Sequence, residues 1–293
     1  MISRPASLLA LLLVLALSPC FAQEAAAKRQ RVDADTVFLG ANVLPMDRER
    51  VLENHDVFVK DGRIVAVHPT RTARAGKKAQ VIKAQGKYLM PGVSEMHGHY
   101  PQEADSELTQ SFLFLYVANG VTLVRGMQGG PQHLPLRDAV AKGEVIGPRL
   151  LVCAPMLHGH FVRNAEKAEE LVREAAKKGF DHLKVHEQLS PAVFDAIAST
   201  ATEVGLEFSG HVPNEVGLWD ALKKGQRTID HLDGYVEALV EDPSRTEELG
   251  LFELGKLAGE IDEKRIASTV KATLDAGAGV VGTMELWEVL FGS

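Results

Sequence analysis

The chain has 293 residues, of which 45% are hydrophobic and 24% are charged, and its formal net charge at pH 7 is −7. This composition is typical of a globular protein with a sizeable core, and the length suits one large domain or two smaller ones. The acidic balance gives no basis for binding nucleic acid or an anionic membrane surface.

The first 22 residues have the pattern of a secretory signal peptide. Arg4 precedes the apolar run "SLLALLLVLALS", and small residues follow through Ala22. The run is shorter than the roughly 20 residues that a membrane span needs. We therefore expect no membrane span, cleavage after Ala22, and a periplasmic or secreted protein. A lipoprotein anchored at Cys20 is the alternative, although Pro19 fits poorly before a lipidated cysteine.

The cysteine content excludes a disulfide framework. Cys20 would leave with the signal peptide, and Cys153 would then stand alone in the apolar run "RLLVCAPML". We expect Cys153 to be a small buried hydrophobic residue.

Residues 23–35 are polar and predict a disordered lead-in. From 36 to 90, short alternating runs such as "DVFVKDGRIVAV" surround a turn at Asp61 and Gly62, which predicts a small β-sandwich module. From 91 to 293, apolar β runs alternate with amphipathic helices. Four helices are expected, at 164–179, 190–205, 214–225 and 262–277.

Alternating β and α units predict an α/β fold with a parallel sheet covered by helices. This alternation is consistent with an open doubly wound sheet and with a closed (β/α) barrel. The segment "MHGHYPQEAD", which follows the first β run, is not a Gly-rich phosphate loop, and polar residues fall late in successive β runs. We therefore favour a (β/α)8 TIM-like barrel, of which about seven strands are present in this sequence.

Two histidines end the first β run of this second region, in "PGVSEMHGHY". Residues i and i+2 of a strand share a face, so His97 and His99 point the same way. Two imidazoles side by side suit a common cation. The alternative is one buried histidine with hydrogen-bond partners and one exposed at the strand end.

Three later β runs also contain a polar residue that could bind a metal. Lys184 lies in the middle of "FDHLKVHEQ", and a lysine inside a β run is unfavourable unless it is paired or chemically changed. His211 ends "LEFSGHV", and His231 ends "RTIDHLD". Because these residues cluster at strand ends, we expect them to meet His97 and His99. A solvent-facing Lys184 at a strand edge is the alternative.

Five segments in this order resemble the metal-dependent amidohydrolase superfamily, in its imidazolonepropionase-like and prolidase-like branch. They are "YLMPGVSEMHGHY", "NGVTLVRGM", "HLKVH", "SGHVP" and "TIDHLDG". The resemblance implies that His97 and His99 bind the more buried metal and that His211 and His231 bind a second one. It also implies that Lys184 carries CO₂ as a carbamate that bridges both metals.

Imidazole and carboxylate-type donors suit Zn²⁺, so the expected cofactor is a divalent metal, with two Zn ions. The resemblance implies an exported hydrolase that breaks a C–N bond of a dipeptide or cyclic amide with a metal-activated water. His160, in "LHGH", resembles a pocket-lining residue and is the candidate substrate contact, although His158 fits equally. His182 and His186 have no assigned role beyond support of the ligands or a place at a strand end.

Members of this superfamily carry a general-base aspartate on an eighth strand, and the sequence ending in "VVGTMELWEVLFGS" contains neither. Asp275 and Asp230 do not fit as substitutes, because one lies at a helix end and the other precedes His231. We therefore expect a C-terminally truncated enzyme. One alternative is a catalytically impaired remnant that binds metal or a small ligand, and another is a mononuclear deaminase in which Lys184 is an ordinary lysine.

Overall fold

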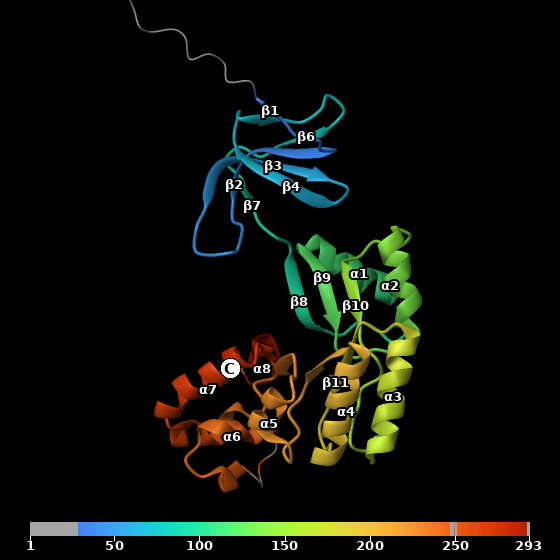
Figure 1. Ribbon diagram of the computed structural model, residues 1–293, viewed down its shortest axis with the longest axis vertical. Coiled ribbons are helices and arrows are strands. Elements are labelled where there is room, and N and C mark those ends of the chain that lie inside the picture. Colours follow the sequence, from blue (N-terminus) through green and yellow to red (C-terminus); the bar gives the residue numbers. More distant parts are fainter. Residues whose placement is uncertain (1–28, 247–248, 250, 292–293) are drawn as a thin grey trace, which may run out of the picture. The chain divides into compact units, whose positions relative to one another are not determined.

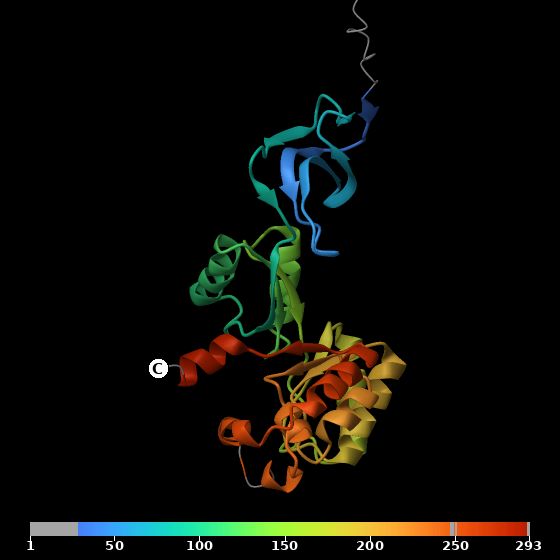
Figure 2. The same ribbon diagram turned by 90° about the vertical axis from the view of Figure 1, so that its left-hand side faces the viewer.

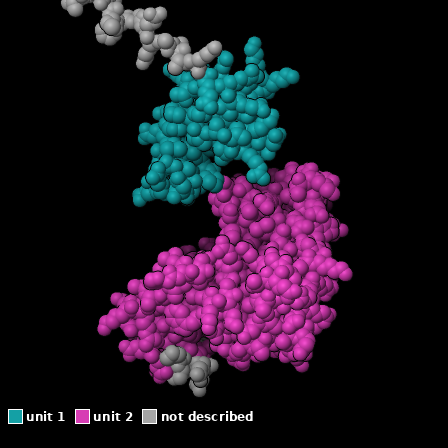
Figure 3. Space-filling model, in the orientation of Figure 1, with its two compact units in different colours: residues 1–91 teal, residues 92–293 magenta. Residues whose placement is uncertain are grey.

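The computed structural model describes residues 29–246, 249 and 251–291. The expected signal peptide, residues 1–22, lies outside the described residues. The chain divides into two compact units, Met1–Pro91 and Gly92–Ser293 (Figure 3). Within the described residues, no helix is both long enough and apolar enough to cross a membrane.

The first unit is built from short strands. A five-stranded sheet has the order β4–β3–β2–β6, with β7 also paired to β2, and β1 and β5 form a separate pair. The strands are β1 (Gln30–Arg31), β2 (Thr36–Val43), β3 (Leu52–Lys60), β4 (Arg63–Pro69), β5 (Ala73–Arg74), β6 (Gln80–Lys83) and β7 (Tyr88–Leu89). The expected turn at Asp61 and Gly62 joins β3 to β4, with φ angles of 49° and 72°. The expected β-rich N-terminal region is therefore confirmed.

The lead-in that we expected to be disordered is structured from residue 29 onward. Gln30 and Arg31 pair in parallel with Ala73 and Arg74. Val32 and Ala34 are each 8% exposed and pack in the same cluster as Phe58. Val32 and Ala34 alternate with polar residues, so the local sequence does not show that they are buried against other strands. The expected boundary at residue 36 is therefore wrong.

The second unit contains parallel strands in chain order, with helices between them (Figure 1). One sheet has the order β10–β9–β8 and the other β11–β12–β13–β14. Parallel bridges from Cys153 to His182 and from Leu157 to Val185 join the β10 and β11 regions. The strands are β8 (Val93–Gly98), β9 (Val121–Gly126), β10 (Arg149–Val152), β11 (His182–Val185), β12 (Glu207–Gly210), β13 (Thr228–Asp230) and β14 (Gly279–Val281). The mixed α/β fold is confirmed.

The helices begin and end largely where their capping residues predict. Asn164 caps α3 through its side chain, which accepts the N–H of Lys167, and Gly179 ends α3 in the left-handed conformation at φ 78°. The helices are α1 (Glu107–Ala118), α2 (His133–Lys142), α3 (Ala165–Lys178), α4 (Pro191–Val204), α5 (Gly217–Lys223), α6 (Tyr235–Leu239), α7 (Lys264–Asp275) and α8 (Met284–Phe291), with 3₁₀ segments η1 (Pro243–Thr246) and η2 (Leu251–Glu260). Helices α3 and α4 run side by side, and α8 (red) projects from the end of β14 (Figures 1 and 2).

The core of this unit lies between the strands and the helices. Its fully buried side chains include Leu183 on β11, Phe194 and Ile197 on α4, and Ile229 on β13. Because the strands are parallel and adjacent, their carboxyl ends open toward one side. The residues that follow β8, β11, β12 and β13 can therefore share one site.

Candidate metal centre

The five expected metal ligands surround one cavity. His97 lies in β8 and His99 follows it, Lys184 lies in β11, and His211 and His231 directly follow β12 and β13. All five line a cavity of about 750 Å³, together with Met127, Met156 and residues of β14 and α8. The structure thus brings together side chains that are up to 134 positions apart, since 231 − 97 = 134.

Seven imidazoles form a continuous series, which we call the histidine row: His99, His97, His231, His211, His186, His158 and His160. The first five of them line the cavity. Consecutive ring centroids are 5.2, 4.5, 4.7, 4.3, 4.8 and 4.9 Å apart in that order. The inner part of the row, from His99 to His211, contains the four expected histidine ligands. The outer part, from His186 to His160, extends beyond them.

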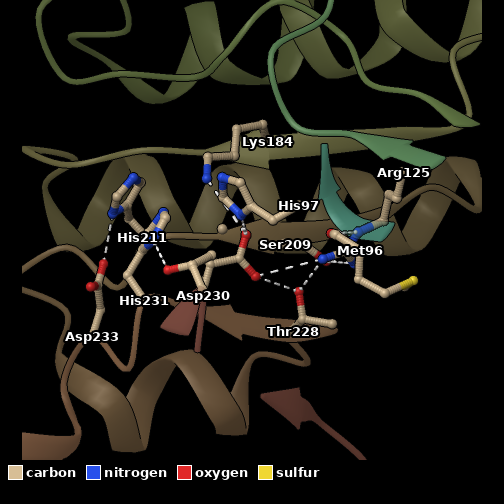
Figure 4. Close-up of polar contacts among 12 residues, drawn as sticks. Met96, His97, Arg125, Lys184, Ser209, His211, Thr228, Asp230, His231 and Asp233 are labelled. Atoms are coloured by element: carbon tan, nitrogen blue, oxygen red, sulfur yellow. Dashed lines mark hydrogen bonds and ion pairs between the residues drawn. The ribbon is translucent and has the colours of Figure 1, made fainter. Parts of the chain in front are cut away.

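Two inner histidines have a carboxylate that fixes their tautomer. His97 Nδ1 is 2.8 Å from Asp230 Oδ2, and His211 Nδ1 is 2.7 Å from Asp233 Oδ2 (Figure 4). Since an ionised carboxylate only accepts hydrogen bonds, Nδ1 of His97 carries the proton beside Asp230, and Nδ1 of His211 carries it when Asp233 is ionised; the Nε2 lone pair is then left for a cation. His231 Nδ1 has a similar oxygen neighbour, Thr283 Oγ1, at 2.8 Å. This donor set fits a divalent metal such as Zn²⁺.

Burial keeps His211 and His231 neutral at pH 7. It lowers the pKa of His211 to about 3 and that of His231 to about 3, and the neighbouring cationic groups, Lys184 among them, act in the same direction. Burial also lowers the pKa of His99, with His97 and Lys184 contributing. Neutral imidazoles at neutral pH are the form that binds a metal.

Lys184 is buried with 3% of its surface exposed, so the alternative of a solvent-facing lysine is wrong. Burial lowers its pKa, although the charges of Asp230 and Asp233 act in the opposite direction. Its Nζ lies 3.6 Å from Asp230 Oδ2. Gly210, at φ 129°, makes room for the lysine, because a Cβ there would lie 2.8 Å from Lys184 Cδ.

Asp230 belongs to the site, although the sequence analysis set it aside. It is completely buried, accepts a hydrogen bond from Thr228 Oγ1 at 2.9 Å, and lies 3.6 Å from the Arg125 guanidinium (Figure 4). Burial alone would raise its pKa, but His97, Lys184 and Arg125 lower it to about 2. Successive strand residues normally face opposite sides, but β13 ends here and His231 has φ 60°, so Asp230 and His231 reach the same cluster.

Asp233 is the second residue that sequence reasoning missed. It is 5% exposed, and its Oδ1 has no hydrogen-bond partner among the described residues. Burial raises its pKa to about 7. The signal that could have revealed both carboxylates is their spacing around His231 in "DHLD", but nothing local shows that they point toward other strands. Asp275 is exposed and pairs with Lys271, away from this site.

Four other histidines were considered in the sequence analysis: His158, His160, His182 and His186. His182 is 4% exposed, and neither of its ring nitrogens has a hydrogen-bond partner among the described residues. His186 lines the cavity, and His160 is exposed at the outer end of the row. Within the described part of the chain, one group of three His, Cys, Asp or Glu residues has its ligand atoms all within 4.8 Å of one another, and it consists of His158, His186 and Glu187.

Comparison with known proteins agrees with this architecture, although no family model matches the chain. A Xaa-Pro dipeptidase structure with bound methionine aligns over 87% of this chain and 68% of its own, with a TM-score of 0.65 and 16% identity. A putative prolidase from Bifidobacterium longum aligns over 88% and 78%, with a TM-score of 0.62 and 20% identity. These likenesses show the fold.

In sequence, an adenine deaminase of Ruegeria sp. (strain TM1040) is 30% identical over 155 residues, which are 50% of this chain. The match spans 25% of the length of that deaminase. The chain therefore shares the fold of solved prolidase and amidohydrolase structures. The resemblance inferred from the sequence is therefore confirmed at the level of the fold.

Proposed function

We propose that this protein is a metal-dependent amidohydrolase that hydrolyses a C–N bond of a small substrate. The observation that carries the proposal is the arrangement of His97, His211 and His231, each with Nδ1 against an oxygen atom and Nε2 left for a cation. A buried structural histidine would also have a hydrogen-bond partner, so what distinguishes these three is that their rings converge on one cavity. The adjacent cavity of about 750 Å³ leaves room for a substrate.

In this proposal His97 and His99 hold one divalent ion, and His211 and His231 hold the other. Lys184 would provide a further ligand as a carbamate: its neutral Nζ would form a bond to the carbon of CO₂ and release one proton, which gives an anionic pair of oxygen donors. The lowered pKa of Lys184 supports this step, because only the neutral amine is a nucleophile. Bound metal ions of this kind supply a water of lowered pKa and polarise the carbonyl under attack.

The chain's own carboxylates hold this arrangement in place. Asp230 and Asp233 fix the ring orientation and tautomer of His97 and His211. Asp230 also gives the buried Arg125 an anionic neighbour, and it does the same for Lys184 as long as that side chain is an unmodified lysine. His160, at the outer end of the histidine row, is proposed as a substrate contact.

The substrate class is proposed from the structural neighbours. A Xaa-Pro dipeptidase and a putative prolidase share the fold, which supports a dipeptide as substrate, with a cyclic amide as the alternative. Export to the periplasm or the medium is proposed from the signal-like residues 1–22.

A second candidate is deamination of an aminopurine. It is favoured by the 30% identity to an adenine deaminase over half of this chain. The two candidates share a water attack on a carbon bonded to nitrogen and differ in the leaving group, an amine in one case and ammonia in the other.

The test is the metal content of the purified protein, followed by turnover of a panel of Xaa-Pro and other dipeptides, cyclic amides and adenine. We expect about two Zn ions per chain, loss of turnover on chelation and recovery with Zn²⁺. Turnover that is indifferent to chelation would contradict the proposal. Stoichiometric metal without turnover of any panel member would support the binding-only alternative instead.

A further inference from the structure

The buried guanidinium of Arg125, on β9, connects this strand to three other strands of the second unit. Its Nε donates to Met96 O in β8 at 2.8 Å, its Nη1 to Ser209 Oγ in β12 at 3.4 Å, and its Nη2 to Thr228 Oγ1 in β13 at 2.9 Å (Figure 4). Because Arg125 is only 6% exposed, these protein atoms take the place of water as acceptors for its N–H groups.

The three atoms that Arg125 contacts belong to residues that lie one to three positions before a histidine of the candidate metal centre. The pairs are Met96 before His97, Ser209 before His211, and Thr228 before His231. Backbone atoms this close in sequence move together within a strand. One side chain therefore restrains the positions of three of the candidate ligands at once.

The strands that Arg125 connects belong to two different sheets. Strand β8 ends one sheet and β14 ends the other, and no ladder joins β8 to β12, β13 or β14 within the described residues. Strands β12 and β13 are also joined by their own ladder and by Gln226 Nε2, which donates to Gly210 O at 2.9 Å and to Thr228 O at 3.1 Å. Strand β8 is connected to them through side chains, by the contact of His97 with Asp230 and by Arg125.

The charge of Arg125 by itself would oppose the binding of a cation. The guanidinium lies 3.6 Å from Asp230 Oδ1, and Asp230 Oδ2 lies 2.8 Å from His97 Nδ1. A positive charge in this position repels a cation that His97 holds. A role through charge and a role through geometry therefore predict opposite effects on metal affinity when Arg125 is replaced by a neutral residue.

We propose that Arg125 is a positioning residue whose planar set of N–H donors fixes the spacing between the two halves of the metal centre. One half is His97 and His99 at the end of β8, and the other is His211 and His231 after β12 and β13. A guanidinium suits this role because its five donors have fixed directions, whereas the ammonium of lysine is a compact charge on a flexible stem. The inference rests on the metal centre of the proposed function.

The experiment measures the zinc affinity of the full chain by competition with a coloured chelator, in buffer where circular dichroism shows each variant to be folded. R125M should weaken zinc binding by about 10-fold or more, as is typical when a group that orients a ligating histidine is lost. R125K keeps the charge but not the planar set of donors, and its affinity should fall to within about 3-fold of that of R125M.

The matched control is R137M. Arg137 also joins separate segments, because its Nη1 donates to Gly179 O and to Asp181 Oδ2 at 2.9 Å each, but it contacts none of the strand ends that carry the candidate ligands. R137M should therefore leave the zinc affinity unchanged within about 2-fold. Urea unfolding of all three variants, measured on chelator-treated protein, separates a loss of stability from a loss of zinc affinity.

A rise in zinc affinity in R125M would show that charge repulsion dominates, and it would overturn the inference. Full zinc affinity in R125K would also overturn it, because charge rather than donor geometry would then be sufficient. So would a lower urea midpoint in R125M and R125K with unchanged zinc affinity, since that describes a purely structural arginine. If R125M does not fold, R125K decides by the same criteria, because it keeps the charge beside Asp230.

The assay needs no turnover, so its result is separate from that of the proposed hydrolysis. A protein with the expected zinc affinities that hydrolyses no member of the substrate panel would contradict the proposed function alone. An unmodified chain that binds no zinc would overturn both.

Discussion

Replacing Asp230 by asparagine is the most informative change within the candidate site. The side chain keeps its size but loses its charge, while His97, Lys184 and Arg125 lose their common anionic neighbour. Because Asp230 is fully buried, water cannot take its place. Both the stability of the metal-free chain and its affinity for zinc should therefore fall.

The size of the stability loss follows from the pKa. A carboxyl whose pKa is lowered from 3.8 to about 2 in the folded state contributes about 2 kcal/mol at pH 7. That contribution is present above pH 4 and is lost as the pH falls from about 4 toward 2. Removing one partner of a buried charge cluster leaves the others uncompensated, which costs about 3–5 kcal/mol in measured cases. We expect D230N to lose about 2–5 kcal/mol at pH 7.

The assay is urea unfolding of the chelator-treated protein at pH 7, together with zinc affinity from competition with a coloured chelator. Loss of a carboxylate that orients a ligating histidine typically weakens metal binding about 10–100-fold. D275N is the matched control, because Asp275 makes an exposed ion pair with Lys271 that is worth at most about 1 kcal/mol. If D230N and D275N unfold at the same urea concentration and bind zinc equally, the assignment of Asp230 to the site is wrong.

Three further outcomes are expected. Protein purified without CO₂ should regain activity on addition of bicarbonate, and K184M should show no such response in the same dipeptide assay. In a C20S background, Cys153 should resist iodoacetamide at pH 8 until urea is added, because burial raises its pKa to about 12; mass spectrometry detects the adduct. G159A should lower the melting temperature, because the new Cβ would meet Gln188 O at 1.8 Å, whereas G76A, with nothing within 4 Å, should leave it unchanged.

Local signals in the sequence predicted the helices well. The expected helix at 190–205 is α4, Pro191–Val204, with Ser190 before it and Gly205 at φ 75° after it. The expected helix at 262–277 is α7, Lys264–Asp275. These boundaries depend on residues within a few positions of each other, so a single sequence contains the required information.

The clustering of His97, Lys184 and His211 was also predictable, because parallel strands present their carboxyl ends on one side. The carboxylates that orient the histidines were not predictable from the sequence. Asp230 reaches His97 across 133 positions, and the backbone turn at His231 that permits it has no sequence marker. The burial of Val32 and Ala34 was missed for the same reason, since their partners lie on other strands.

The tautomer of each histidine depends on whether its Nδ1 partner is local or distant in the chain. At the outer end the partners are backbone N–H groups one or two residues later, so the order of residues in "HGH" and "HE" already places a donor beside Nδ1. At the inner end the partners are carboxylates 22 and 133 residues away. His158 and His186 therefore present an N–H because of their local backbone, whereas His97 and His211 present a lone pair because the fold brings a distant carboxylate to Nδ1, and His231 has the distant Thr283 Oγ1 in that place. Asp230 and Asp233 are consequently as decisive for cation binding as the histidines that they orient.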